Sequence, residues 1–436
     1  MNGNSSATHA NISVVQWNNV DKWLPADEVS IKDLHTENPT EAPKIIAPST
    51  QVFMVIAHTP KDRENEQQKY REEFVDTFFM SKLWCLDHLK NANGYFGCEA
   101  TRNEGSVTGF NTWSFFEVKH VPEDRTEYYW SKINISTRWL SSTNQMGIFL
   151  FDPTDKVLDP LLHPDQRQLN DPFWIYTGVL QEVARLQEIA VWEIRHHVRN
   201  IEKEAEKEAK AREEEKRKNP NSLGKRPKPD YRRLHDIARH AIHVTETLDV
   251  AVQNVDHIIR QHEMYMHTRR EQYAPNTPQD VSFEDISSRL SFFQSHIESI
   301  RHRSISNHKR LQNEIQLKFN EVAQYDAGLT VEISRAARSD SATMKTLAFV
   351  TLTFLPPTFI CALFSMSFFN YDRDTGWAVS DKLWIYWVFA VPTTIATALL
   401  WQYWSKLFPR YLFHMHGNEA QEYDHEEPKE KLPLEV

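Results

Sequence analysis

The stretch MKTLAFVTLTFLPPTFICALFSMSF, residues 344–368, decides the fold of this chain together with a second apolar stretch, LWIYWVFAVPTTIATALLWQYWS, residues 383–405. Residues 346–371 and 383–405 contain no Asp, Glu, Lys or Arg. A helix of about 20 apolar residues crosses the roughly 30 Å hydrocarbon core of a bilayer, so both stretches are predicted to span a membrane. The alternative is a buried hairpin in a soluble domain. It is disfavoured because soluble core helices seldom lack charge on every face.

The charges that flank the two spans predict their orientation. Basic residues precede the first span and follow the second: Arg335, Arg338, Lys345, Lys406 and Arg410. The loop between the spans, residues 369–382, is slightly acidic. Because the cytoplasmic flanks of membrane helices are enriched in Lys and Arg, we expect an integral membrane protein with both termini in the cytoplasm. The plasma membrane and the vacuolar membrane fit equally well.

The remainder of the chain has the composition of a soluble protein. The chain has 436 residues, a formal net charge of -10 and 40% hydrophobic residues. This acidic balance argues against nucleic acid as a partner, because nucleic-acid binders present a basic face. Residues 50–160 contain no Gly-rich phosphate loop and neither the G-x-S-x-G nor the H-E-x-x-H motif, so we expect no enzymatic activity.

Changes in composition divide the chain into segments and predict an α+β membrane protein. The segments in order are a disordered N-terminal region 1–48, a cytoplasmic α/β domain 49–170, an antiparallel helix pair 171–281, a stalk helix 282–343, the first transmembrane helix 344–368, an outer loop 369–382, the second transmembrane helix 383–405, and a basic end with an acidic disordered tail 406–436. A docked segment near residues 17–24 is expected within the first of these.

Periodicity predicts the secondary structure of the soluble part. Strands are expected at 51–57, 111–121, 128–136 and 147–151, where β-branched and aromatic residues are frequent. A helix at 62–89 would turn Phe74, Phe78, Leu83 and Leu86 inward. Two long helices, 174–217 and 230–270, would form the antiparallel pair. The end of the first, IEKEAEKEAKAREEEKRK, is expected to be solvated charge supported by pairs within the helix.

A third helix is predicted to run without interruption from residue 283 to 368. Its apolar residues recur at alternating spacings of three and four, from Ile286 through Leu311 and Ile333 to the first span. At 1.5 Å per residue such a helix is on the order of 130 Å long. An isolated rod of this length is not stable, and its repeat favours packing against copies of itself in a symmetric ring.

One face of the first span carries the candidate pore lining: Met344, Leu347, Thr351, Leu355, Thr358 and Ala362, followed by Ser365. In a ring of helices the large apolar side chains would close a path by excluding water, and the threonines would offer rings of hydroxyls. The alternative is that this face packs helix against helix, as small and hydroxyl residues do in membranes.

The first span also resembles a known family. Met344-Lys345, Leu347, Phe354, Pro356 and Thr358-Phe359-Ile360 match the pore helix of CorA-type magnesium channels, as MK-x-L-x6-F-x-P-x-TFI. The order of segments over residues 50–412 is also similar, and the chain looks most like the divergent fungal-type branch that is compared with the zinc transporter ZntB. The resemblance implies a homopentamer in a lipid membrane, with the first spans lining the pore. It implies Mg²⁺ or another divalent cation as the transported and possible regulatory ion, with no tightly bound cofactor.

The chain departs from this family at the outer end of the pore helix. Where the family has Gly-Met-Asn, this sequence has Ser365, Met366 and Ser367. In the family these groups hold a hydrated divalent ion, and a serine hydroxyl reaches less far than an asparagine amide. Magnesium releases its waters reluctantly, so the change bears on selectivity and conduction. Two hypotheses stay open: a CorA-like channel or transporter, and a non-conducting membrane-anchored scaffold or regulator.

Other candidate ligands are weaker. In the outer loop Asp372, Asp374 and Asp381 would raise the local concentration of cations or would simply be solvated. By their position on the stalk, Asp326, Glu332 and Asp340 are candidates for a regulatory metal site of the family type. Zinc sensing by His240 and His243 is a further possibility, although histidines on long helices are more often ordinary surface residues.

Overall fold

The computed structural model describes residues 12–18, 22–23, 27–35, 41–58, 64–86, 89, 91–103, 106–123, 127–162, 168–220, 223–272, 280–373 and 376–407. Within these ranges some side chains, those of residues 64–70, 281–284, 364–370 and 404–407 among them, are not described. The chain divides into two compact units, Met1–Ala323 and Gln324–Val436.

The first unit contains an eight-stranded sheet in the order β2-β1-β4-β8-β7-β6-β5, with β3 paired to β1. The strands are β1 Ile12–Asn18, β2 Lys22–Trp23, β3 Asp27–Val29, β4 Val52–Ala57, β5 Gly94–Asn103, β6 Ser106–His120, β7 Tyr129–Leu140 and β8 Gln145–Phe151. β4 and β8 are parallel, and each of the other described pairs is antiparallel.

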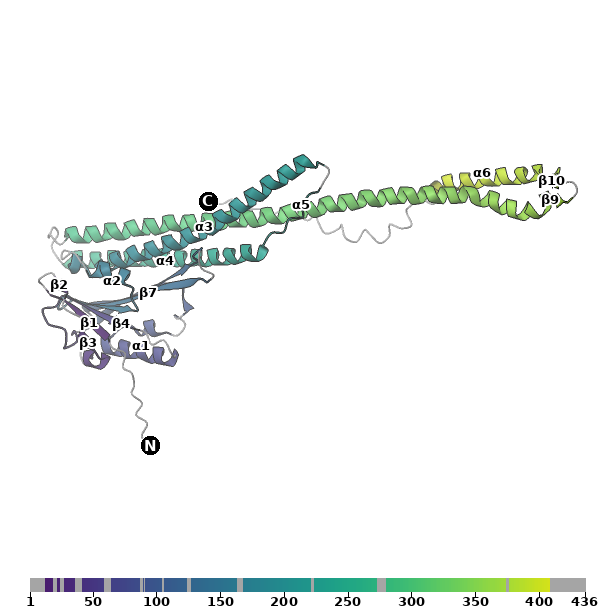
Figure 1. Ribbon diagram of the computed structural model, residues 1–436. Coiled ribbons are helices and arrows are strands. Elements are labelled where there is room, and N and C mark those ends of the chain that lie inside the picture. Colours follow the sequence, from purple (N-terminus) through teal and green to yellow (C-terminus); the bar gives the residue numbers. More distant parts are fainter. Residues whose placement is uncertain are drawn as a thin grey trace, which may run out of the picture. The chain divides into compact units, whose positions relative to one another are not determined.

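Helices cover both faces of this sheet (Figure 1). Alternate residues of β4 point to opposite faces, so Phe53 and Val55 pack with α1, Glu64–Phe78, while Val52 and Met54 pack with the long helices. The long helices are α3, Trp174–Lys218, α4, Tyr231–Gln272, and the first part of α5, Asp280–Phe368. Short helices complete the unit: η1 Ile31–Leu34, η2 Lys82–Cys85, α2 Asp155–Leu161 and η4 Gln168–Asn170.

The prediction that residues 1–48 are mostly disordered is wrong for residues 12–18. β1 pairs with β4, and its Ile12 and Val14 are buried on one face while Trp17 is buried on the other. Trp17 also packs edge-on against Trp23 at a ring distance of 5.3 Å, inside the expected docked segment. Pairing with a central strand supplies hydrogen bonds and burial that local composition does not reveal. Residues 1–11, 19–21, 24–26 and 36–40 lie outside the described part.

The helix predicted at 62–89 ends early. α1 stops at Phe78, and Phe79 takes a left-handed backbone conformation, with φ at 50°. The reversed chain is held by Arg138, which donates to the Phe78 carbonyl at 2.8 Å. Phe74 and Phe78 are buried as expected, but Leu83 and Leu86 are exposed because they no longer belong to the helix. β5 was not predicted at all.

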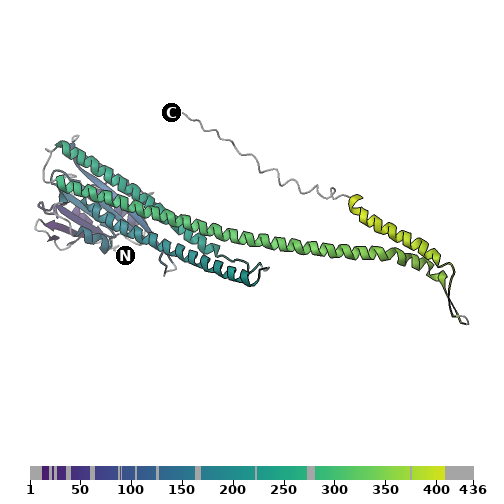
Figure 2. The same ribbon diagram turned by 90° about the horizontal axis from the view of Figure 1, so that it is seen from above.

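The prediction of one continuous third helix is confirmed, since α5 has 89 residues and contains Pro356 and Pro357 without ending (Figure 2). Its first part packs with α3 and α4 through Ile286, Leu290 and Ile297, which are fully buried. Asn307 donates to the carbonyl of Val191 on α3 at 3.1 Å, which fixes the register of the two helices.

The second unit contains the end of α5, a hairpin of β9, Phe369–Asp372, with β10, Gly376–Val379, and α6, Trp384–Leu407. Two helical segments are long and apolar enough to cross a membrane: Asp285–Leu363, with a mean hydropathy of 1.8 in its most apolar window, and Trp384–Tyr403, with 1.4. Their apolar windows are 11% and 6% buried, unlike the core helices of a soluble protein. The fold class is therefore as predicted: a mixed α and β protein with long helices and two candidate membrane helices at its C-terminal end.

Candidate membrane-spanning site

One face of α5 packs against α6. The rings of Phe349 and Trp401 lie 5.1 Å apart. Pro356 and Ile360, which follow Phe349 at spacings of seven and four, are buried, and so is Ala390 of α6. A spacing of seven or four keeps residues on the same side of a helix, so these side chains form a single contact face.

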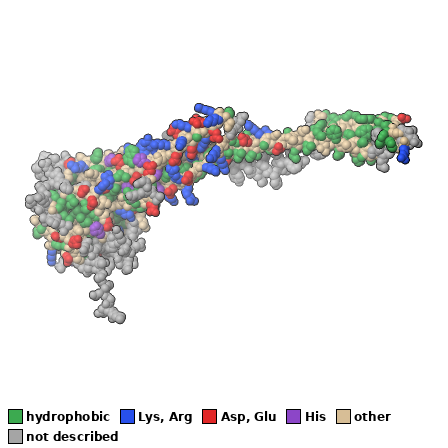
Figure 3. Space-filling model, viewed as in Figure 1, with side chains coloured by type: hydrophobic (Ala, Val, Ile, Leu, Met, Phe, Trp, Pro, Cys, Tyr) green, Lys and Arg blue, Asp and Glu red, His purple; other side chains and the backbone are tan. Residues whose placement is uncertain are grey.

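The opposite face of α5 carries the sequence-predicted stripe, and it is exposed. Leu347 is 67% exposed, Met344 and Leu355 are similar, and Thr351, Thr358 and Ala362 are also exposed. At about 100° per residue, Leu347 and Thr358 lie roughly opposite Pro356. In Figure 3, apolar side chains gather over the part of the molecule that α6 and the end of α5 form together. The structure therefore brings the six residues together on one face, and the large apolar side chains of that face, Met344, Leu347 and Leu355, are 72%, 67% and 61% exposed.

The two threonines of the stripe are bonded to their own helix. Thr351 donates its hydroxyl hydrogen to the carbonyl of Leu347 at 2.9 Å, and Thr358 donates to that of Phe354 at 2.9 Å. The donors are satisfied, while each hydroxyl oxygen keeps lone pairs that can accept from water or contact a cation. The same bonds make a threonine acceptable in lipid or between packed helices. Whether the threonine oxygens meet water, lipid or another helix therefore depends on what packs against this face.

The remaining sequence-predicted residues are only partly described. Ser365, Met366 and Ser367 belong to the last turns of α5, but their side chains lie outside the described part. Asp372 ends β9 with its side chain not described, Asp374 is not described, and Asp381 is exposed beyond β10.

The stalk carboxylates do not form a metal centre within one chain. Asp326 is half-buried, and Glu332 and Asp340 are exposed. Their spacings of six and eight residues place them about 9 and 12 Å apart along α5. Across the residues that the structure describes, no group of three or more His, Cys, Asp or Glu side chains could hold a metal ion.

The histidines of α4 contact aromatic residues. His240 packs on Tyr128 at a ring distance of 5.2 Å, and His243 lies 6.5 Å from Trp130 and 3.1 Å from a carboxylate oxygen of Glu246. Burial, followed by the charge of Lys119, lowers the pKa of His240. These contacts support the role of ordinary packing residues.

Sequence reasoning missed a cleft of about 900 Å³ in the first unit. It lies where β7 continues past the end of β8, because the two strands pair only from Asn134 onward. Its lining includes Lys132, Glu182 and Arg185, and Arg185 is fixed by two 2.6 Å contacts to Glu182. Glu182 and Arg185 are three residues apart on α3, but Lys132 comes from β7, so no local sequence signal could have placed the two elements around one cleft.

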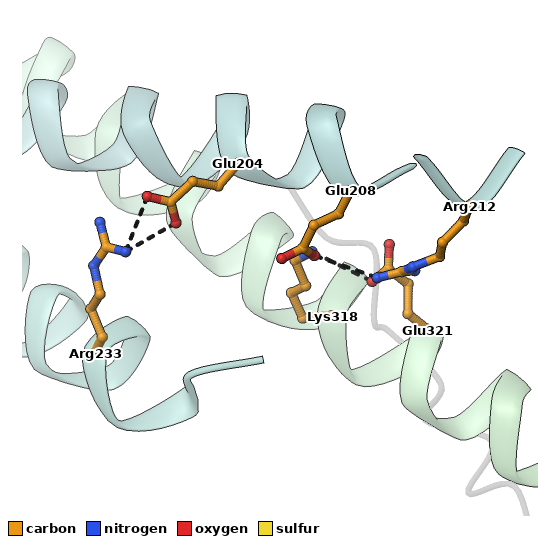
Figure 4. Close-up of polar contacts among 6 residues, drawn as sticks. All are labelled: Glu204, Glu208, Arg212, Arg233, Lys318 and Glu321. Atoms are coloured by element: carbon orange, nitrogen blue, oxygen red, sulfur yellow. Dashed lines mark hydrogen bonds and ion pairs between the residues drawn. The ribbon is translucent and has the colours of Figure 1, made fainter. Parts of the chain in front are cut away.

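Sequence reasoning also missed contacts made by the charged end of α3. Glu202, Glu208 and Arg212, expected to be solvated, reach side chains of α5. Figure 4 shows two of these contacts, those of Glu208 and Arg212 with Lys318 and Glu321. Glu208 and Arg212, four residues apart, lie on the same side of α3, but the sequence contains no sign of the partner helix.

No protein-family model matches the chain. A curated protein, the notoamide biosynthesis cluster protein M' of Aspergillus versicolor, is 31% identical over 293 residues, which are 65% of this chain and 61% of that protein. The chain thus matches less than two thirds of that relative's length.

Three solved structures are similar at low sequence identity. Full-length CmaX is 14% identical with a TM-score of 0.36, and the match covers 91% of this chain and 98% of that one. The CorA magnesium transporter of Methanocaldococcus jannaschii is 11% identical with a TM-score of 0.35, covering 91% and 97%. The cytoplasmic domain of ZntB from Vibrio parahaemolyticus is 7% identical with a TM-score of 0.37, covering 72% and 99%. TM-scores below 0.5 do not establish a common arrangement of whole chains.

Proposed function

We propose that this chain is a CorA-like transporter of divalent cations that works as a homopentamer in a lipid membrane, with α5 of each copy facing a common axis. The observation that carries the proposal is the exposed face of α5, which lies opposite α6 and combines apolar residues with two threonines. In a ring, α6 would face lipid and this face would surround a path for ions.

The segment of α5 before the span supports self-association. Leu329, Val331 and Ile333 are exposed there, close to the charged Arg335 and Arg338. Contact with lipid would be unfavourable for the charged residues of this segment, and contact with water would be unfavourable for its apolar side chains. Copies of the same helix satisfy both requirements, because Leu329 and Ile333, four residues apart on one side of α5, can meet their counterparts while Arg335 and Arg338 stay at the rim.

Each part of the face has a role in this proposal. Met344 and Leu347 would narrow the path at the cytoplasmic end and exclude water when it is closed. Thr351 and Thr358 would offer rings of oxygen to a hydrated ion. Ser365, Met366 and Ser367 would stand at the outer mouth, and the outer-loop aspartates would attract cations to it.

Mg²⁺ or a related divalent ion is the proposed cargo, moving down its gradient, with both termini in the cytoplasm. Asp326, Glu332 and Asp340 would act as regulatory ligands only between neighbouring copies, since one copy holds them apart on its own helix. The curated relative carries the name of a biosynthesis cluster, and no substrate follows from it.

One observation favours a second candidate, a non-conducting membrane scaffold. Ser365, Met366 and Ser367 replace the Gly-Met-Asn that the resembled family has at the ion-binding mouth. Loss of the amide removes a long, polar group that bonds the waters around magnesium. A chain that kept the architecture and lost this group would keep its assembly without its transport.

The deciding experiment is ion uptake by liposomes that contain the purified full chain, with Mg²⁺, Co²⁺, Ni²⁺ and Zn²⁺ tested in turn and empty liposomes as the control. Uptake of at least one ion by material whose mass is that of a pentamer supports the transporter. Absence of uptake from such a pentamer supports the scaffold. The double change Ser365→Gly and Ser367→Asn is expected to raise magnesium uptake. If the purified chain has the mass of a monomer, the proposal of a pore formed by several copies is wrong.

A further inference from the structure

The end of α3 leaves the apolar core of the first unit. The buried residues of α3 extend to Ala205, although the helix continues to Lys218. On α5 the last fully buried apolar residue of this unit is Leu311. Residues 206–218 therefore add no buried apolar side chain, and the described contacts that join this segment to α5 are polar ones, made by Glu208 and Arg212.

Those contacts form a cluster that we call the clasp: Glu202, Glu208 and Arg212 of α3 with Arg310, Glu314, Lys318 and Glu321 of α5. Arg310 contacts both carboxylate oxygens of Glu202, at 2.8 and 2.5 Å. Lys318, whose side chain is only 8% exposed, lies 2.6 Å from Glu208 and 3.5 Å from Glu321. Arg212 completes the cluster at 3.0 Å from Glu321 (Figure 4).

The clasp has one carboxylate more than it has cations. Glu202, Glu208 and Glu321 each contact at least one of its three cations, as described above. Glu314 is the surplus group: its Oε2 is buried and has no hydrogen-bond partner in the described part of the chain. Burial is the main factor that raises the pKa of Glu314, and Glu202 and Glu321 add to it while Lys318 and Arg310 oppose it. From α4, Arg233 is already paired with Glu204 at 3.0 Å.

We propose that the clasp is a proton-operated latch, in which protonation of Glu314 removes the surplus charge and fastens residues 206–218 of α3 to α5. An ionised Glu314 repels Glu202 and Glu321, and its uncovered charge is stabilised when the end of α3 moves away and admits water. The apolar part of the bundle does not depend on this group. Opening is therefore local and leaves the packing of Ile286 to Leu311 intact.

The direction of the pH effect follows from linkage. The pKa of Glu314 is raised above its ordinary value of 4.5 in the closed clasp. A raised pKa means that the closed form binds the proton more tightly than the open form does. Closure is accordingly strongest below the ordinary pKa and is lost as pH rises through the higher pKa of the closed form. This latch does not depend on whether the chain transports ions.

The test is hydrogen–deuterium exchange of the full chain in detergent, corrected for the intrinsic pH dependence of exchange. The peptide covering 206–218 is compared with a reference peptide from the buried part of α3, residues 183–198. In the unmodified chain, protection of 206–218 is expected to fall several-fold between a pH below 4.5 and neutral pH, while the reference peptide keeps its protection. Raised salt should lower protection of 206–218 at acidic pH, because screening weakens ion pairs.

Two variants and one control assign the effect. Glu314→Gln should hold 206–218 at its acidic level of protection at both pH values. Lys318→Met should leave that peptide weakly protected at both, with the reference peptide unchanged as proof of folding. Glu204→Gln, a carboxylate of the same helix that pairs with α4, should keep the pH dependence. A pH response that is absent from the unmodified chain, or that persists in Glu314→Gln, overturns the latch.

Discussion

α5 has two different environments, one within the first unit and one in the segment that leads into the first candidate membrane helix. Between Ile286 and Leu311 its apolar stripe is buried by α3 and α4 of the same chain. Between Leu329 and Leu363 the same kind of stripe is exposed except where α6 covers it. The spacing of apolar residues along a helix thus predicts that one face is buried. It does not predict whether that face packs against the same chain, against lipid or against another copy.

The sharpest test of this contrast is a matched pair of leucines. Leu290 is 0% exposed and Leu347 is 67% exposed on the same helix. Leu290→Ala is expected to lower the free energy of unfolding of the first unit by about 2–5 kcal/mol, because it leaves a cavity in a packed core. Leu347→Ala should leave that free energy unchanged. Denaturant unfolding of the full chain in detergent, followed by circular dichroism, measures both, and equal effects would refute the contrast.

A second pair of residues tests what packs against the exposed apolar side chains of α5 just before its membrane-spanning part. Ile333 is 61% exposed and Met264 of α4 is 62% exposed. If copies of the chain meet along α5, Ile333→Glu should weaken assembly by about 1.5–3 kcal/mol per copy, the loss expected for one buried aliphatic side chain. Met264→Glu should not change assembly. Mass photometry over a range of protein concentrations reads the result, and an Ile333→Glu chain that keeps its oligomeric mass would show that this face is not an interface.

A third pair separates the two faces of the span. Leu347 is 67% exposed, whereas Leu352 is half-buried and lies one helical turn before the buried Pro356. In a closed pore a leucine ring excludes water, so Leu347→Asn is expected to raise ion uptake by about tenfold, or about 1.4 kcal/mol in the barrier. Leu352→Asn should leave uptake unchanged, with a lower thermal stability of the helical hairpin. If Leu352→Asn raised uptake and Leu347→Asn did not, the wrong face would have been assigned to the pore.

Sequence alone predicted the elements whose pattern is long and uniform. α3, α4 and α5 follow from apolar spacing over many turns, and Pro356 and Pro357 did not stop α5. The predictions failed where a distant contact decides the structure. β1 is ordered because it pairs with β4, α1 ends because Phe79 reverses the chain, and β9 and β10 form a hairpin in a segment expected to be a simple loop.

The same distinction between local spacing and distant contacts applies to the functional residues. Helical spacing alone grouped Met344, Leu347, Thr351 and Leu355 on one face, and that face is the one opposite α6. The clasp was not predictable, because the charges of α3 satisfy the rule for pairs within a helix. Lys210 does pair with Glu206 four residues away, whereas Glu208 pairs with Lys318 of α5. Charge spacing in a sequence does not distinguish a pair within a helix from a pair between helices.

The smallest expected effect compares two ion pairs at the end of α3. Glu204 and Arg233 are both substantially exposed, and Lys318, the partner of Glu208, is buried. Exposed pairs contribute about 0.2–1 kcal/mol because water and salt screen them, so a double-mutant cycle on Glu204 and Arg233 should give a coupling energy in that range. The cycle on Glu208 and Lys318 should give a larger value that decreases less on addition of salt, because removing one partner leaves a poorly solvated charge. Equal couplings with equal salt dependence would mean that the end of α3 is held no more firmly to α5 than to α4, and that burial of Lys318 adds nothing to the attachment.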